Sequence, residues 1–120
     1  SYPIAGESLE KGSKVPHGLA VSITAPATLR LLTPYLVEKI GNISYLFGFK
    51  EYDVEVWEII TNFMKILDFP NGLNEIGFRK SELHVLAEKA LLQTRLLSMS
   101  PVHVNVKLLE RILEESFLLW

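Results

Sequence analysis

The residues of this sequence best suited to chemistry lie in the stretch Val15-Pro16-His17-Gly18, which precedes a long apolar run. A neutral imidazole such as that of His17 is a common metal ligand. Pro16 fixes the backbone at the entry to this run and removes one backbone donor, and Gly18 leaves room for the close approach of backbone or ligand. The pattern makes His17 a candidate metal ligand. The alternative is that His17 only fills the entrance of a structural element.

The remaining residue types offer little further chemistry. His84 and His103 form no His-x-x-x-His pair, so we do not expect a metal site built from this chain alone. The sequence has no cysteine, which excludes disulfides, a thiolate nucleophile and Cys-type zinc sites. It has no glycine-rich phosphate loop and no Gly-x-Ser-x-Gly motif. We therefore assign no catalytic residue.

The elements around His17 differ in how clearly the sequence defines them. Residues 1–14 are polar and contain Gly6 and Gly12, which predicts a loop. In Leu19–Leu32, the alternation of apolar and smaller residues favours a half-buried strand. Pro26 argues against a central strand, and a helix kinked at this proline is the alternative. Periodicity does not decide between the two.

Helices are predicted more clearly in the rest of the chain. Thr33-Pro34 is typical of a helix start, and the apolar face that follows extends to Phe47, with Gly48 as the stop. Asp53 is predicted to cap a helix that ends before Pro70-Asn71-Gly72. Ser81 is predicted to cap a helix through Leu92, and Asn105 to cap the last one. Arg95–Pro101 is predicted as a loop between them.

Composition limits the classes of partner. The 120 residues predict a single domain. A net charge of −2 gives no electrostatic reason to expect nucleic acid or an anionic membrane as a partner. With 48% apolar residues, the chain is rich in apolar surface for its size, so we expect an exposed patch that supports self-association or a partner. No apolar run has the length of a membrane span, and a start at Ser1 hints at processing or an incomplete chain.

Several motifs in this sequence resemble the iron-dependent alcohol dehydrogenase family, most strongly its hydroxyacid-oxoacid transhydrogenase branch. The resemblance lies first in Pro16-His17-Gly18-Leu19-Ala20-Val21 and Ile23-Thr24-Ala25-Pro26-Ala27. It extends to Ser1-Tyr2-Pro3-Ile4, Asn71-Gly72-Leu73, Ile76-Gly77-Phe78, Lys80-Ser81 and the closing Glu115-Ser116-Phe117. It covers nearly all of this chain, but only the C-terminal part of the family's length.

The resemblance implies a fold and a site. It implies that Leu19–Leu32 is helical, and we predict an all-α protein: one helical-bundle domain of about five helices over residues 1–120, with residues 1–14 as a loop. In the family, one aspartate and three histidines hold iron(II) or zinc, and an N-terminal α/β domain binds NAD(P). Only His17 corresponds to a metal ligand in this chain. Tyr2 corresponds to a cofactor-binding position near the nicotinamide.

The function implied by the resemblance is that of the C-terminal, metal-contributing domain of an NAD(P) oxidoreductase. We expect the chain alone to be inactive and to bind metal weakly, because the other ligands and the cofactor site belong to a missing N-terminal half. Its expected partner is that complementary half, or a second copy of itself. The alternative is a non-catalytic helical interaction module that retains the family fold. We expect a cytoplasmic location.

Overall fold

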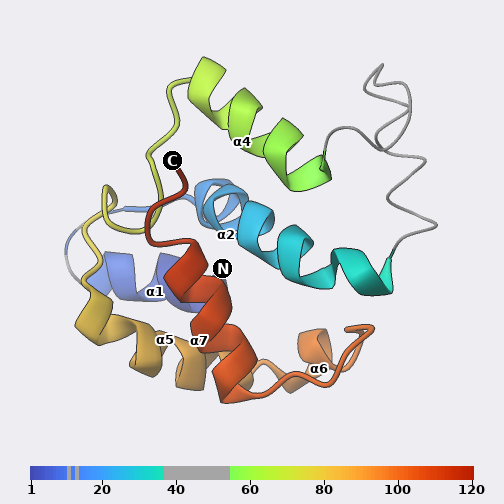
Figure 1. Cartoon of the computed structure of the whole chain (residues 1–120). Helices are drawn as coiled ribbons and strands as arrows, with labels where there is room; N and C mark the ends of the chain where they lie inside the picture. The colour runs from blue at the N-terminus through green and yellow to red at the C-terminus, as the bar shows by residue number, and fades with distance from the viewer. Residues whose placement is uncertain (11, 13, 37–54) are drawn as a thin grey trace.

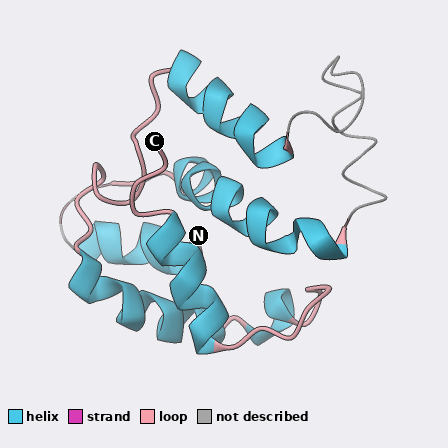
Figure 2. Ribbon diagram, in the orientation of Figure 1, coloured by secondary structure: helices cyan, strands magenta, loops and turns pink. Residues whose placement is uncertain are grey.

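The computed structural model describes residues 1–10, 12, 14–36 and 55–120, and this part of the chain contains helices and loops but no strand (Figure 2). The α-helices are α1 (Tyr2–Glu10), α2 (His17–Leu32), α4 (Val56–Ile66), α5 (Leu83–Leu91), α6 (Thr94–Leu97) and α7 (Val106–Glu115). Two short 3-10 helices, η1 (Thr33–Tyr35) and η2 (Lys80–Glu82), follow α2 and precede α5. The predicted all-α fold is confirmed.

The segment predicted as a loop over residues 1–14 is largely a helix, so that prediction was wrong. Helix α1 buries Ile4 and Ser8, which are one helical turn apart and therefore on the same face. The Ser8 hydroxyl donates to the Ala5 carbonyl at 2.8 Å and accepts from the Val15 amide at 3.2 Å. Burial of one face outweighs the polar composition and the glycine, because most helix stability in proteins comes from tertiary packing.

Helix α2 resolves the ambiguity of Leu19–Leu32 in favour of the helix that the family resemblance implied. It contains Pro26 in its interior, buried against its neighbours. Hydroxyl groups on this helix donate to carbonyls of the preceding turn, as in Ser22 to Gly18 at 2.9 Å and Thr28 to Thr24 at 2.7 Å. Bonds between residues four apart are typical of a helix and are not made in an extended strand. Helix α2 is central and packs against α1, α4 and α7 (Figure 1).

The next two predicted helices are tested only in part. Thr33 and Pro34 form the short η1 directly after α2, and most of the helix predicted to follow them lies outside the described residues. Asp53, the predicted cap of the next helix, also lies outside them. Helix α4 begins at Val56, where the Glu58 carboxylate accepts from the backbone amide of Glu55 at 3.3 Å. It packs against α2.

The starts of the last three helices agree only in part with the prediction. Ser81 is not the predicted N-cap: it lies inside η2, where the Glu82 carboxylate accepts from the Arg79 amide at 2.7 Å, and α5 starts at Leu83. The short α6 occupies part of the predicted loop at Arg95–Pro101. Asn105 is the N-cap of α7 as predicted, since its side chain accepts from the Leu108 amide at 2.9 Å.

The core lies between α1, α2, α5 and α7 and continues into the segment after α4. It comprises Ile4, Val15, Ala20, Ile23, Met64, Leu73, Phe78, Leu83, Leu86, Ala87 and Leu113. The segment from Asn71 to Phe78 is tied to the C-terminus, because the Leu73 amide donates to the Ser116 carbonyl at 2.9 Å. Among the described helices, none is long and apolar enough to cross a membrane.

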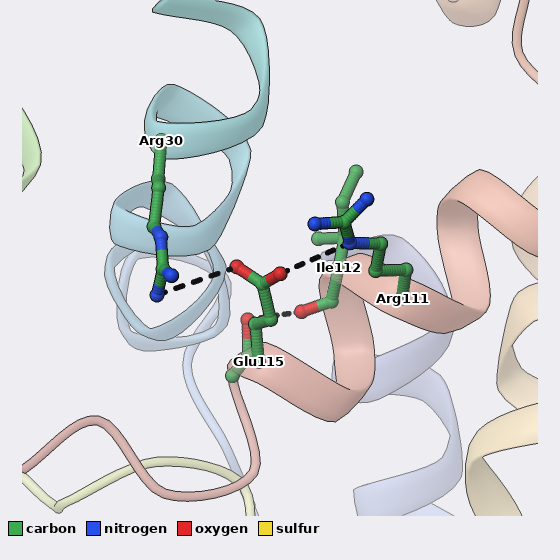
Figure 3. A network of polar contacts seen from close by, with 5 residues as sticks. Arg30, Arg111, Ile112 and Glu115 are labelled. Atoms are coloured by element: carbon green, nitrogen blue, oxygen red, sulfur yellow. Dashed lines mark hydrogen bonds and ion pairs between the residues drawn. The ribbon is translucent and has the colours of Figure 1, made fainter.

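A charged contact joins the central helix to the last one (Figure 3). The Glu115 carboxylate at the end of α7 lies 3.8 Å from the Arg30 guanidinium of α2 and accepts from Arg111 Nε at 3.1 Å. The Arg30 guanidinium also lies 5.5 Å from the centre of a Trp57 ring on α4. The half-buried Trp57 thus takes part in joining three helices.

Candidate functional site

The two predicted site residues lie together at the starts of two helices. Tyr2 is the first residue of α1, and His17 is the first residue of α2. Their ring centroids are 4.7 Å apart, with an angle of 43° between the ring planes. Packing of Ser8 and Val15 brings the start of α2 alongside α1, and this contact places two aromatic side chains that are distant in sequence side by side.

The surface around this pair is open. Tyr2 is 54% exposed, and His17 and Gly18 are also exposed. A Cβ atom added at Gly18 would meet no atom of the chain within 4 Å. Pro16 provides the turn into α2 with φ −59° and ψ 146°, without a side-chain capping bond. His17 therefore projects from a fixed backbone on a surface that another domain or a ligand can approach.

His17 has no companion metal ligands within the part of the chain that the structure describes. No group of three or more His, Cys, Asp or Glu side chains there has a geometry suited to a metal ion. His17 can serve as one corner of a site whose other ligands come from elsewhere, and Tyr2 supplies an aromatic face beside it. The assignments of His17 to metal and Tyr2 to cofactor remain predictions.

The two other histidines lie away from this pair. His84, in the first turn of α5, lies between two carboxylates: Nε2 is 3.5 Å from Glu88 and Nδ1 is 3.4 Å from Glu110 of α7. The Glu110 contact was not predicted, because nothing in the spacing of these residues indicates that α5 and α7 pack together. His103 is exposed in the loop before α7.

An apolar cavity of about 340 Å³ was not predicted from the sequence, although helices at the positions of α2, α5 and α7 were expected. It lies between α2, the C-terminal end of α5, the α6 segment and α7. A sequence pattern indicates which face of a helix is apolar. It does not indicate whether the facing side chains fill the space between helices.

Three relatives are similar to this chain, and each is a much longer protein. They are the "Probable hydroxyacid-oxoacid transhydrogenase, mitochondrial" of Dictyostelium discoideum, 26% identical over 92% of this chain and 21% of the relative, and two proteins named "Hydroxyacid-oxoacid transhydrogenase, mitochondrial". The human one is 24% identical over all of this chain and 29% of its own length. The Xenopus tropicalis one is 27% identical over 84% of this chain and 25% of its own length. No solved structure matches the chain.

These names overturn one expectation drawn from the sequence. A cytoplasmic location was predicted for want of any opposing signal, whereas all three relatives are named as mitochondrial proteins. The absence of cysteine is compatible with several compartments, so it was a poor basis for choosing one.

A family model identifies the chain more firmly than pairwise similarity does. The C-terminal model of the Fe-containing alcohol dehydrogenase family matches residues 9–117, which include His17 and the helices from α2 to α7. The match begins after Tyr2, so it carries no information on that residue. Because the model matches most of the sequence, the chain belongs to the Fe-containing alcohol dehydrogenase family and comprises the C-terminal domain of that family.

Proposed function

We propose that this chain is the metal-contributing C-terminal part of an NAD(P)-dependent oxidoreductase, with His17 as a metal ligand and Tyr2 beside the nicotinamide. The observation that carries the proposal is the contact between the Tyr2 and His17 rings at 4.7 Å on an open surface. These are the two residues that the family resemblance assigns to metal and cofactor, and the fold brings them together.

The residues present fit one corner of a metal site. An exposed imidazole at the start of a helix can offer a nitrogen lone pair to a metal ion, and the open space at Gly18 allows a second domain to come close. Iron(II) or zinc would supply Lewis-acid polarisation of an alcohol or carbonyl oxygen, and NAD(P) would accept or donate hydride. The task of this chain is to present His17 at a fixed position and to place the Tyr2 ring next to it.

The chain spans between about a fifth and a third of the length of the relatives it matches. The remaining ligands and the cofactor site therefore belong, in this proposal, to an N-terminal half. The isolated chain is then expected to show no metal-dependent NAD(P)H turnover, because orientation of the cofactor and metal assistance each contribute several kcal/mol to catalysis.

The test combines the chain with the N-terminal portion of the Dictyostelium relative. Iron(II) or zinc is titrated into the purified pair by calorimetry, with the chain as wild type, His17→Ala or His84→Ala. Mutation of a residue that is hydrogen-bonded to a metal ligand weakens metal binding roughly 10- to 100-fold. Removing the ligand itself should therefore weaken binding by at least roughly tenfold. His84→Ala is the matched control, because His84 is also an exposed histidine in the first turn of a helix.

Equal metal affinity for the wild type and His17→Ala in a pair that forms would contradict the ligand assignment. Failure of the two parts to associate would instead favour the second candidate function, a helical interaction module. The observation that favours this second function is the exposure of large apolar side chains, such as Ile66 at 78% and Met99 at 85%.

A further inference from the structure

The cavity of about 340 Å³ between α2, α5, α6 and α7 is lined mostly by aliphatic side chains. Leu32 of α2, Leu97 of α6 and Ile112 of α7 contribute from three sides. Helix α6 contributes Leu96 and Leu97 to the lining, of which Leu97 is half-buried and Leu96 is exposed. Figure 1 shows α6 and the segment after it set apart from the rest of the bundle, near the C-terminal end of α2.

The lining is uncharged. None of the side chains that line the cavity belongs to Asp, Glu, Lys, Arg or His. Ser1 also contributes to the lining. An ionised ligand would lose its hydration here without gaining an opposite charge. The cavity therefore suits a neutral molecule.

Its polar groups include the hydroxyls of Thr24 and Thr28, whose hydrogens are already used. Thr24 Oγ1 lies 3.1 Å from the Ala20 carbonyl and 3.2 Å from the Val21 carbonyl, and Thr28 Oγ1 donates to the Thr24 carbonyl at 2.7 Å. A hydroxyl has one hydrogen and two lone pairs. The oxygens of Thr24 and Thr28 can still accept a hydrogen bond. A ligand with an O–H donor therefore suits them.

The volume sets the size of the ligand. An apolar cavity of about 150 Å³ in another protein holds benzene, so a space slightly more than twice as large suits about a dozen non-hydrogen atoms. We propose that this cavity binds a neutral aliphatic alcohol of medium chain length, with the chain among the leucines and the hydroxyl donating to Thr28.

Neither Tyr2 nor His17 lines the cavity, although Ser1, which precedes Tyr2, does. Thr24 lies seven residues beyond His17 on the same helix, which corresponds to about 10 Å along its axis. The inference therefore does not rest on the proposed oxidoreductase role, and either can fail without the other.

The test uses 1-decanol and decanoate as probes of the whole chain. Methyl NMR spectra locate binding through shifts at Thr24, Thr28 and Leu97, and thermal unfolding measures the stabilisation that any native-state ligand confers. We expect 1-decanol to raise the melting temperature and to shift these methyl groups, and decanoate to bind at least tenfold more weakly.

Two variants make the test specific. Thr28→Val keeps the shape of the side chain and removes the acceptor, so it should weaken 1-decanol binding about fivefold. Thr61→Val is the matched control, because Thr61 of α4 makes the same kind of bond, to the Trp57 carbonyl at 2.8 Å, outside this cavity. Leu97→Trp should fill the space and abolish binding.

Three results would overturn the proposal. The first is no methyl shift or stabilisation with 1-decanol, and the second is decanoate binding as tightly as the alcohol. The third is an equal affinity of Thr28→Val and Thr61→Val for the alcohol. If Leu97→Trp does not fold, the comparison of the two threonine variants still decides the outcome.

Discussion

Two largely irregular regions of this molecule differ sharply in how they are held. The C-terminal contact region, Asn71–Phe78 together with Ser116–Trp120, contains Leu73 with no exposed surface and Phe78 at 2% exposure. The α6 region, Thr94–Val104, contains Leu96 at 45% and Met99 at 85% exposure.

The difference is in the partners of the backbone. In the C-terminal contact region, the amides of Leu73 and Asn74 donate to the carbonyls of Ser116 and Phe117, which are far away in sequence. Bonds in the α6 region, such as Ser98 to Thr94 and Ser100 to Leu97, are local. Long-range backbone bonds fix an irregular segment against the core, whereas local bonds shape it without anchoring it.

Gly72→Ala is expected to disrupt the C-terminal contact region most strongly and so to cause the largest loss of stability. Gly72 has φ +85°, and an added Cβ would lie 2.6 Å from both the Ser116 and the Phe117 carbonyl oxygens. Strain and a backbone clash together should lower the free energy of unfolding by about 3 kcal/mol or more. Chemical denaturation measures this loss.

Gly77→Ala separates the two causes. Gly77 has φ +91°, but an added Cβ there would meet nothing within 4 Å. Gly77→Ala should lower the free energy of unfolding only by the cost of placing alanine at a positive φ, about 1–2 kcal/mol. Equal losses for the two variants would show that close approach of the C-terminus to Gly72 contributes nothing.

A second pair of variants compares side chains from the two regions. Leu73→Ala removes a fully buried side chain and should cost about 3 kcal/mol. Leu96→Ala removes one that already borders a cavity and solvent, and should cost less than about 1 kcal/mol. Urea unfolding of both variants gives the comparison, and a Leu96→Ala loss as large as that of Leu73→Ala would contradict it.

A third pair compares two asparagines. The Asn71 side chain accepts from the amides of Leu119 and Trp120 at 2.7 and 2.9 Å and also donates to the Trp120 carbonyl. Asn71→Ala should cost about 1–2 kcal/mol. Asn105→Ala removes one capping bond and should cost about 1 kcal/mol.

Hydrogen exchange distinguishes the two asparagine variants further. Asn71→Ala should speed exchange of the Leu119 and Trp120 amides, whereas Asn105→Ala should speed exchange at the start of α7. Unchanged exchange at Leu119 in Asn71→Ala would mean that the Asn71 side chain does not hold the C-terminus.

The smallest effect is expected from an ion pair. Lys89 of α5 contacts Glu7 of α1, and the hydrogen bond that Lys89 donates to this carboxylate raises the pKa of Lys89 above its usual 10.5. A raised pKa in the folded state stabilises the protein below pH 10.5, and this contribution is lost as the pH rises through the folded-state value. Lys89→Met should therefore be slightly less stable than the wild type at pH 7 and indistinguishable from it at strongly alkaline pH.

Thermal melts of both proteins across this pH range check the prediction. Because the pair is exposed, the difference should shrink in high salt. A difference at pH 7 as large as that of Gly72→Ala would show that charge, rather than backbone contact, governs the stability of the bundle.

Local rules predicted the parts of this fold that local interactions determine. Asn105 was recognised as the cap of α7 because its bond to Leu108 is made within one turn. Helix α1 was missed, because its stability comes from burying Ile4 and from the bond between Ser8 and Val15, which are tertiary contacts. Helix α2 was obtained from family resemblance and not from periodicity.

The candidate site was predicted only as two separate residues. Resemblance named Tyr2 and His17, but their contact depends on how α1 packs beside α2, which no spacing in the sequence encodes. The cavity beside α6 could not be foreseen for a related reason. It reflects the absence of filling side chains between helices, one of which, α6, lies largely in a segment predicted as a loop.

Gly18, in the first turn of α2, has a consequence for how this molecule would change under selection. With open space at the Cβ position, replacing this glycine by alanine should make the isolated chain more stable by about 0.5–1 kcal/mol. A library screened for foldedness alone would therefore discard the glycine next to His17. A library screened for assembly with another domain would keep it if that domain comes close to the backbone there.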